Sequence, residues 1–197
     1  MKTVYDFLVS PVDDNRYDNV KKVGDKNLIL NTEIYNHQYI NREAVVNSIP
    51  AAYNTPIKVG DKVLVHHNVF RMFNNMKGKQ VNSRSYYKEN QYFLSLDQMY
   101  MYNNGVGWKA LNGYCFVKPL VNKDILDQEK EIPLMGIVKY SDGTVKQGEL
   151  VGFKPDSEFE FVVNNERLYR VLSKFITIKY EYQGNEEEYN PSWAQSS

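Results

Sequence analysis

Ile57–Val63 reads IKVGDKV, and about ninety positions later Val145–Val151 reads VKQGELV. In each stretch a glycine followed by an acidic residue leads into alternating apolar and polar residues, which is the pattern of a turn that opens a β-strand. The same turn occurring twice in one chain indicates an internal repeat. Such a repeat would divide the 197 residues into two small, related domains.

The repeat extends beyond the glycine turn in both directions and keeps one order. Three further pairs of blocks flank it: Leu8–Val12 with Phe116–Leu120, Arg42–Val46 with Leu134–Val138, and Tyr92–Tyr102 with Leu168–Ile178. Identity within each pair is low, but four blocks in one order are stronger evidence of duplication than any single block.

Composition and local patterns predict β-structure throughout. Sixteen tyrosines and five alanines argue for strands and against long helices. Strict alternation of apolar and polar residues at Glu158–Val162 and at Ile176–Tyr182 predicts half-buried strands. Ser141–Gly143 predicts a tight hairpin turn, because Asp-Gly tolerates the positive φ angles needed there.

We therefore expect an all-β protein built from two small barrels in tandem, at residues 1–103 and 104–183. The remaining residues, 184–197, begin with an acidic run and end in polar residues, so we expect a solvated polar tail. Trp193 is the one residue of this tail expected to anchor it.

Charge and cysteine content argue against several classes of protein. Lysines and arginines number 24, as do aspartates and glutamates, so no net charge attracts nucleic acid or an anionic membrane. Cys115 is the only cysteine, which excludes an intramolecular disulfide and suits a reducing cytosol. Asp6 interrupts the apolar run that a signal peptide needs, and no segment is long enough to span a membrane. We expect a cytoplasmic protein.

No group of residues composes an active site, so we expect neither enzyme activity nor a bound cofactor or metal. His66 and His67 are adjacent, which would send them to opposite faces of a strand and away from a shared metal. Cys115 lies in an apolar stretch and is expected to pack in a core. Gly105–Ala110 has the spacing of a dinucleotide-binding loop but lacks a βαβ context. Three charged residues are expected to lie at a solvent-exposed strand edge: Glu166, Arg167 and Arg170.

The first copy carries a long insertion at residues 13–42, about twice as long as its counterpart in the second copy. Loops this long are usually functional or disordered. Within it, the aliphatic residues Leu28, Ile29 and Leu30 are consecutive, which fits neither a half-buried strand nor an amphipathic helix. They form either a short, fully buried strand or an apolar tripeptide held out for a partner, and the local pattern favours the buried strand.

The order of these features resembles the GroES family of co-chaperonins. The shared features are a strand ending in Val-x-Pro, a long loop with a glycine before an aliphatic tripeptide, a Lys-Val-Gly-Asp-x-Val strand and a closing apolar strand. In the first half they are Leu28–Leu30, Arg42–Val46, Lys58–Val63 and Leu96–Tyr100, and in the second half Gly136–Val138, Lys146–Val151 and Leu168–Val171.

The resemblance implies an irregular GroES-like β-barrel in each half and a mobile loop in the first. It also implies that Leu28, Ile29 and Leu30 dock in an apolar groove on a GroEL-like chaperonin ring to assist protein folding, as part of a homo-oligomer. The second copy offers only Ile125 and Leu126 among charged residues, so no second docking site is expected there. Family members form seven-membered rings of single domains, and two domains per chain do not divide into seven.

A different class of function remains open. The expansions at Asn47–Pro56 and Met72–Asn90, the reduced second copy and the acidic tail also fit a virion structural or assembly protein. Such a protein would use the barrel pair for ring or lattice contacts, with tyrosines at its interfaces. The bias toward Asn, Tyr and Lys suits an AT-rich genome such as that of a phage, in which case the location would be the host cytoplasm.

Overall fold

The computed structural model describes residues 2–17, 20–23, 25–29, 39–124 and 130–196. Every regular element in these ranges is a β-strand or a short 3-10 helix, and the paired strands are antiparallel, so the prediction of an all-β protein is confirmed. No helix in the described parts of the chain has the length and apolar character that crossing a membrane requires.

The elements follow one another along the chain in this order: β1 (Phe7–Pro11), η1 (Val12–Asp14), β2 (Val20–Val23), β3 (Lys26–Ile29), β4 (Glu43–Ser48), β5 (Lys62–Val65), β6 (Met72–Asn74), β7 (Gln80–Asn82), β8 (Tyr86–Lys88), β9 (Gln91–Leu94), η3 (Leu96–Gln98), β10 (Met99–Asn103), β11 (Trp108–Ala110), β12 (Tyr114–Val121), β13 (Glu131–Ser141), β14 (Leu150–Phe153), β15 (Phe159–Val163), β16 (Glu166–Leu172), η4 (Ser173–Phe175), β17 (Ile176–Tyr180) and η5 (Ser192–Ser196).

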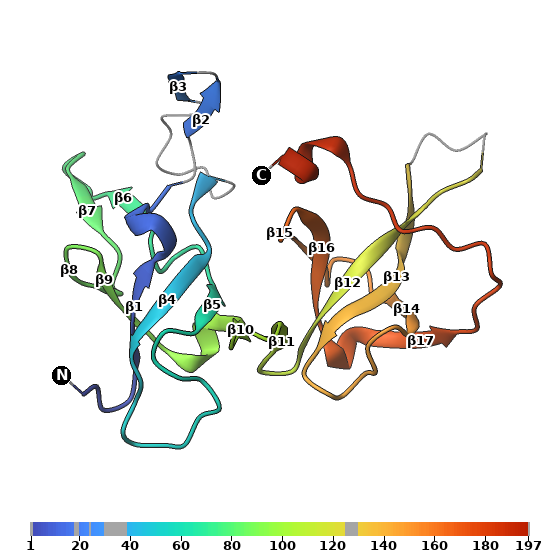
Figure 1. The fold of residues 1–197 in the computed structure, drawn as a ribbon, viewed down its shortest axis with the longest axis horizontal. Coiled ribbons are helices and arrows are strands. Elements are labelled where there is room, and N and C mark those ends of the chain that lie inside the picture. Colours follow the sequence, from blue (N-terminus) through green and yellow to red (C-terminus); the bar gives the residue numbers. More distant parts are fainter. Residues whose placement is uncertain (1, 18–19, 24, 30–38, 125–129, 197) are drawn as a thin grey trace. The chain divides into compact units, whose positions relative to one another are not determined.

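The chain divides into an N-terminal unit, Met1–Trp108, and a C-terminal unit, Lys109–Ser197. The main sheet of the first has the strand order β11-β10-β5-β4-β1-β9-β8, and that of the second has the order β15-β16-β12-β13-β14-β17 (Figure 1). Two small sheets, β2–β3 and β6–β7, stand apart from these. Among the described residues the outermost strands of each main sheet do not pair with each other, so both sheets are open rather than closed barrels.

The two main sheets repeat one topology. Read in reverse, β17-β14-β13-β12-β16-β15 aligns with β10-β5-β4-β1-β9-β8, and β11 is the additional strand of the first sheet. The sheets even share an irregularity: the pairing of β1 with β4 shifts between Leu8 and Val9, and that of β12 with β13 shifts between Phe116 and Val117. The four blocks of the sequence repeat therefore fall on equivalent strands.

The alignment of the last block is wrong by one residue. Tyr92 lies opposite Val9, and Tyr169 lies opposite the equivalent Val117, so Tyr92 corresponds to Tyr169 rather than to Leu168. A slip of one residue in a strand moves every side chain to the other face, and the low identity of this block concealed it.

A bulge explains why the glycine turn recurs. The N–H of Gly60 donates to the carbonyl of Val46 at 2.8 Å, while Val46 donates its own N–H to Asp61 at 3.0 Å. Two residues thus oppose one, which is a β-bulge with glycine in the left-handed conformation. Gly148 and Glu149 repeat this arrangement opposite Val138, with distances of 2.7 and 2.9 Å.

Replacing Gly148 with valine is expected to lower the free energy of unfolding by about 1–2 kcal/mol. Its φ is +84°, which strains a β-branched residue, whereas a Cβ added there would meet nothing within 4 Å. The cost therefore comes from the backbone alone. Gly148→Asn is the matched control, because asparagine tolerates a left-handed φ better than valine and should lose less stability. Equal losses for both variants in urea titrations would contradict the assignment of the cost to φ.

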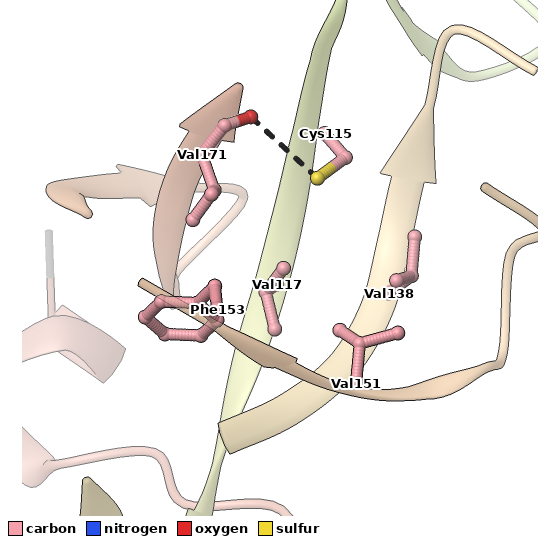
Figure 2. Packing of buried hydrophobic residues seen from close by; sticks show 6 residues of the cluster. All are labelled: Cys115, Val117, Val138, Val151, Phe153 and Val171. Atoms are coloured by element: carbon pink, nitrogen blue, oxygen red, sulfur yellow. Dashed lines mark hydrogen bonds between the residues drawn. The ribbon is translucent and has the colours of Figure 1, made fainter. Parts of the chain in front are cut away.

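The core of the C-terminal unit collects side chains from four strands. Figure 2 shows the cluster, and its members are Cys115, Val117, Val138, Val151, Phe153 and Val171. Cys115 is completely buried, and its Sγ lies 3.5 Å from the carbonyl oxygen of Val171. Each large aliphatic or aromatic member contributes about 1.5–3 kcal/mol when fully buried. The expectation that Cys115 packs in a core is confirmed.

β17 corrects one prediction from alternation. The strand exists, but it is an edge strand of its sheet, and Ile178 and Tyr180 remain 49% and 36% exposed. Alternation gives the direction of each side chain, whereas burial needs a second layer over that face.

The predicted tail is attached to its unit rather than a free extension, although most of its described residues are exposed to solvent. Val121 donates its N–H to the carbonyl of Glu187, and Tyr189 donates to that of Pro119, both at 2.8 Å. Ala194 is completely buried, whereas Trp193, the expected anchor, is 52% exposed. The described part of the tail is thus joined to the end of β12 by backbone hydrogen bonds.

Candidate partner-binding site

The candidate site lies in the connection between β1 and β4 of the N-terminal unit. There β2 and β3 form an antiparallel hairpin in which Val20 pairs with Ile29 and Val23 with Lys26. Figure 1 shows this hairpin projecting from the end of the unit. It belongs to neither main sheet. A two-stranded sheet on its own is marginally stable in water, so this hairpin depends on its attachment to the unit or on a partner.

The two described aliphatics of the predicted tripeptide are exposed. Leu28 is 54% and Ile29 is 61% exposed, while Leu30 lies outside the described residues. The favoured interpretation, a short fully buried strand, is therefore wrong about burial for these two residues, although both lie in a strand. Successive side chains of a strand point to opposite faces, so β3 presents apolar surface on both of its faces.

The root of this connection is firmly attached. The guanidinium of Arg16 donates from Nε and Nη2 to the carbonyl of Phe70, at 3.0 and 2.8 Å, and from Nη1 to Oδ1 of Asn82 at 2.8 Å. The hydroxyl of Tyr17 accepts the N–H of Met72 at 2.9 Å. The site therefore combines an anchored root with an exposed apolar strand.

The returning chain is held at the same place. Asn41 donates its N–H to the carbonyl of Arg16 at 3.0 Å, and Ile40, which bridges to Tyr17, is 2% exposed. In the second copy, Ile125 and Leu126 lie outside the described residues.

The other candidate chemistry of the sequence does not assemble. β5 ends at Val65, so His66 and His67 lie outside the strand, and their rings stack at 4.2 Å instead of facing opposite sides. No cluster of three or more potential metal ligands occurs in the part of the chain that the structure describes. Burial raises the pKa of the Cys115 thiol to about 12, so the thiolate that a nucleophile needs is scarce at neutral pH.

A cluster that the sequence missed surrounds Arg167 in the C-terminal unit. Its side chain, 12% exposed, donates to both Glu131 and Glu160, and from Nη2 to the Tyr169 hydroxyl at 2.6 Å. Burial lowers the pKa of Arg167, but the hydrogen bonds to the two carboxylates outweigh this and raise it above its usual value. The prediction of a solvated edge is wrong for Arg167, because Glu131 is 36 residues away in sequence and no local pattern reveals the contact.

This cluster borders an open depression of about 440 Å³. Aromatic and proline side chains line it beside the charged cluster: Pro133, Phe153, Tyr189, Pro191 and Trp193. Because its guanidinium already binds two carboxylates and a hydroxyl, Arg167 serves the structure of the unit and has little capacity left for a ligand.

No protein-family model and no curated protein matches this chain.

Proposed function

We propose that this protein is a non-enzymatic co-chaperonin with two tandem GroES-like domains, each built on an open sheet, which docks on a GroEL-like chaperonin ring through Leu28, Ile29 and Leu30 and assists protein folding. The observation that carries the proposal is the exposure of Leu28 and Ile29 on a hairpin outside the main sheet, 54% and 61% respectively. The order of sequence features that resembles the GroES family supplies the identity of the partner.

Docking of this kind balances two free energies. Complete burial of a leucine or isoleucine side chain contributes about 1.5–3 kcal/mol, and ordering the surrounding chain offsets much of this. A single loop then binds weakly. Several copies of the chain in one homo-oligomer would present several loops to one ring, and their effective concentration restores tight binding. Weak individual contacts also permit release in each chaperonin cycle.

The triple substitution L28S/I29S/L30S is expected to abolish binding to a purified GroEL-like ring, measured by native mass spectrometry and co-sedimentation. The fold should survive, because Leu28 and Ile29 contribute little buried surface to the unit. V59S/V106S is the matched control: both valines are exposed in the same unit, at 61% and 89%, outside the hairpin. The control should bind like the wild type. Undiminished binding of the triple variant, or no binding by the wild type, contradicts the proposal.

The apolar edge of β17 favours a second candidate, a phage virion structural or assembly protein that uses the same domains for ring or lattice contacts. Ile178 and Tyr180 of this strand are 49% and 36% exposed, and Tyr182, two residues beyond its end, is 52% exposed. β17 has no partner on its outer side among the described residues, and exposed aliphatic and tyrosine side chains beside such an edge are suited to association between chains. A fixed copy number of the protein in purified particles would favour this candidate over the first.

A further inference from the structure

A second hairpin of the N-terminal unit ends in an exposed methionine. β6 and β7 pair from Met72 with Asn82 to Asn74 with Gln80. The turn between them is closed by Asn75, whose Oδ1 accepts the N–H groups of Lys77 and Lys79, both at 3.0 Å. Met76 at this turn is fully exposed. The turn thus holds an apolar, adaptable side chain in solvent on a defined backbone.

This hairpin shares its root with the candidate docking hairpin. Arg16, which precedes β2, binds the carbonyl of Phe70 before β6 and the side chain of Asn82 at the end of β7. Tyr17 accepts the N–H of Met72, the first residue of β6, at 2.9 Å. Figure 1 shows both hairpins leaving the same end of the N-terminal unit. A partner protein that docks on β2–β3 would therefore lie close to β6–β7 as well.

Both hairpins carry the same charge in a chain whose formal net charge is zero. Residues 20–29 contain three lysines and one aspartate, a net charge of +2, and residues 72–82 contain Lys77 and Lys79 and no acidic residue, again +2. Two segments with a net positive charge and exposed apolar side chains are complementary to a surface in which apolar pockets lie among acidic residues.

The C-terminal unit has no counterpart of β6–β7 in its described residues. In the N-terminal unit residues 66–85 separate β5 from β8, whereas only residues 154–158 separate the equivalent strands β14 and β15. The second hairpin therefore occurs in the unit that carries the exposed Leu28 and Ile29. Because the C-terminal unit forms the same main sheet without such a hairpin, we assign β6–β7 to partner binding rather than to the stability of the repeated fold.

We propose that the β6–β7 turn is a second contact with the partner that receives β3, with Met76 entering an apolar pocket and Lys77 and Lys79 facing acidic residues around it. This inference rests on the proposed function, because it assigns both hairpins to one partner. The docking surface then consists of two hairpins, β2–β3 and β6–β7, and the hydrogen bonds of Arg16 connect them at their base.

The variant M76S/K77E/K79E is expected to bind a purified GroEL-like ring about tenfold more weakly than the wild type, and with a weaker dependence on salt. K58E/V59S/K62E is the matched control, because it replaces one exposed apolar side chain with serine and two exposed lysines with glutamate around the Gly60 turn, with Lys62 at the start of β5. The control alters only one weak ion pair, between Lys62 and Glu43 at 3.9 Å, and should bind like the wild type.

A fluorophore attached at position 76 tests directly whether the β6–β7 turn contacts the ring. Cys115 is buried and is the only cysteine, so the variant M76C offers a single accessible thiol for an environment-sensitive fluorophore. Its emission should shift to shorter wavelength when the ring is added, while the same dye on V106C should not respond. A shift on M76C that follows protein concentration without the ring would assign the turn to self-association and overturn the inference.

The two proposals fail differently. If the wild type does not bind the ring, the proposed function is wrong. If the wild type binds and L28S/I29S/L30S does not, but M76S/K77E/K79E binds as tightly as the wild type, only the second contact is wrong.

Discussion

Gly136→Ala is expected to destabilise the C-terminal unit by about 3 kcal/mol or more, since overpacking against backbone cannot be relieved by a rotamer change. A Cβ at this position would overlap the carbonyl oxygen of Lys118 and lie 2.7 Å from Cγ1 of Val117. Both neighbours belong to β12, which pairs with β13 through Gly136 itself, opposite Pro119. Adding one methyl group would therefore push apart two central strands of the sheet.

Calorimetry of the full chain should show the transition of the C-terminal unit at a markedly lower temperature. Gly152→Ala is the matched control, because its Cβ would meet the ring of Tyr180 at 3.0 Å, and that side chain is 36% exposed, so a small shift toward solvent relieves the contact. Ala44, the equivalent of Gly136 in the N-terminal unit, already carries a Cβ and is fully buried. A Gly136→Ala chain as stable as Gly152→Ala would show that β12 and β13 separate easily.

Arg167→Ala is expected to cost about 3 kcal/mol, because it leaves partly buried carboxylates without their cation. Glu131 and Glu160 are 25% and 43% exposed at their side chains, so Glu131 loses more than Glu160. Tyr169 also loses the guanidinium, which lies 4.8 Å from the centre of its ring. The fork of hydrogen bonds is specific to arginine, so Arg167→Lys should recover only part of the loss.

Lys123→Ala provides the control for this second prediction. Lys123 forms an ion pair with Glu187 in which the side chains are 47% and 67% exposed, and exposed pairs contribute about 0–1 kcal/mol. Urea titrations of the three variants should rank Arg167→Ala as the least stable and Lys123→Ala as close to the wild type. Equal stability of Arg167→Ala and Lys123→Ala would contradict a structural role for the cluster.

Local sequence patterns were sufficient for much of the fold. The glycine turn at Gly60 and Gly148 could be predicted because a left-handed φ excludes most other residues, so the constraint is visible in the residue itself. Strands such as β15 could be predicted because alternation reports the pleat of a single strand. The repeat could be found because its blocks kept their order, even where the alignment of β16 slipped by one residue.

The candidate site was predicted less completely. Sequence singled out Leu28, Ile29 and Leu30 as unusual, since three consecutive aliphatics exceed what one face of a strand can bury. It could not decide whether they are covered, and the local pattern favoured the wrong alternative for Leu28 and Ile29. It also gave no sign that Arg16 binds Phe70 and Asn82, which are 54 and 66 residues away.

The sequence by itself thus determined the all-β class, the repeated order of strands and the position of the aliphatic tripeptide, because each depends on backbone preferences and side-chain direction within a few residues. Tertiary structure alone decided that Leu28 and Ile29 are exposed, that Arg167 is enclosed by carboxylates, that β17 is an edge and that the tail binds β12. Burial and strand pairing depend on which distant segment covers a given face. The stabilising contacts therefore join residues far apart in the sequence, and a pattern within a few consecutive residues does not reveal them.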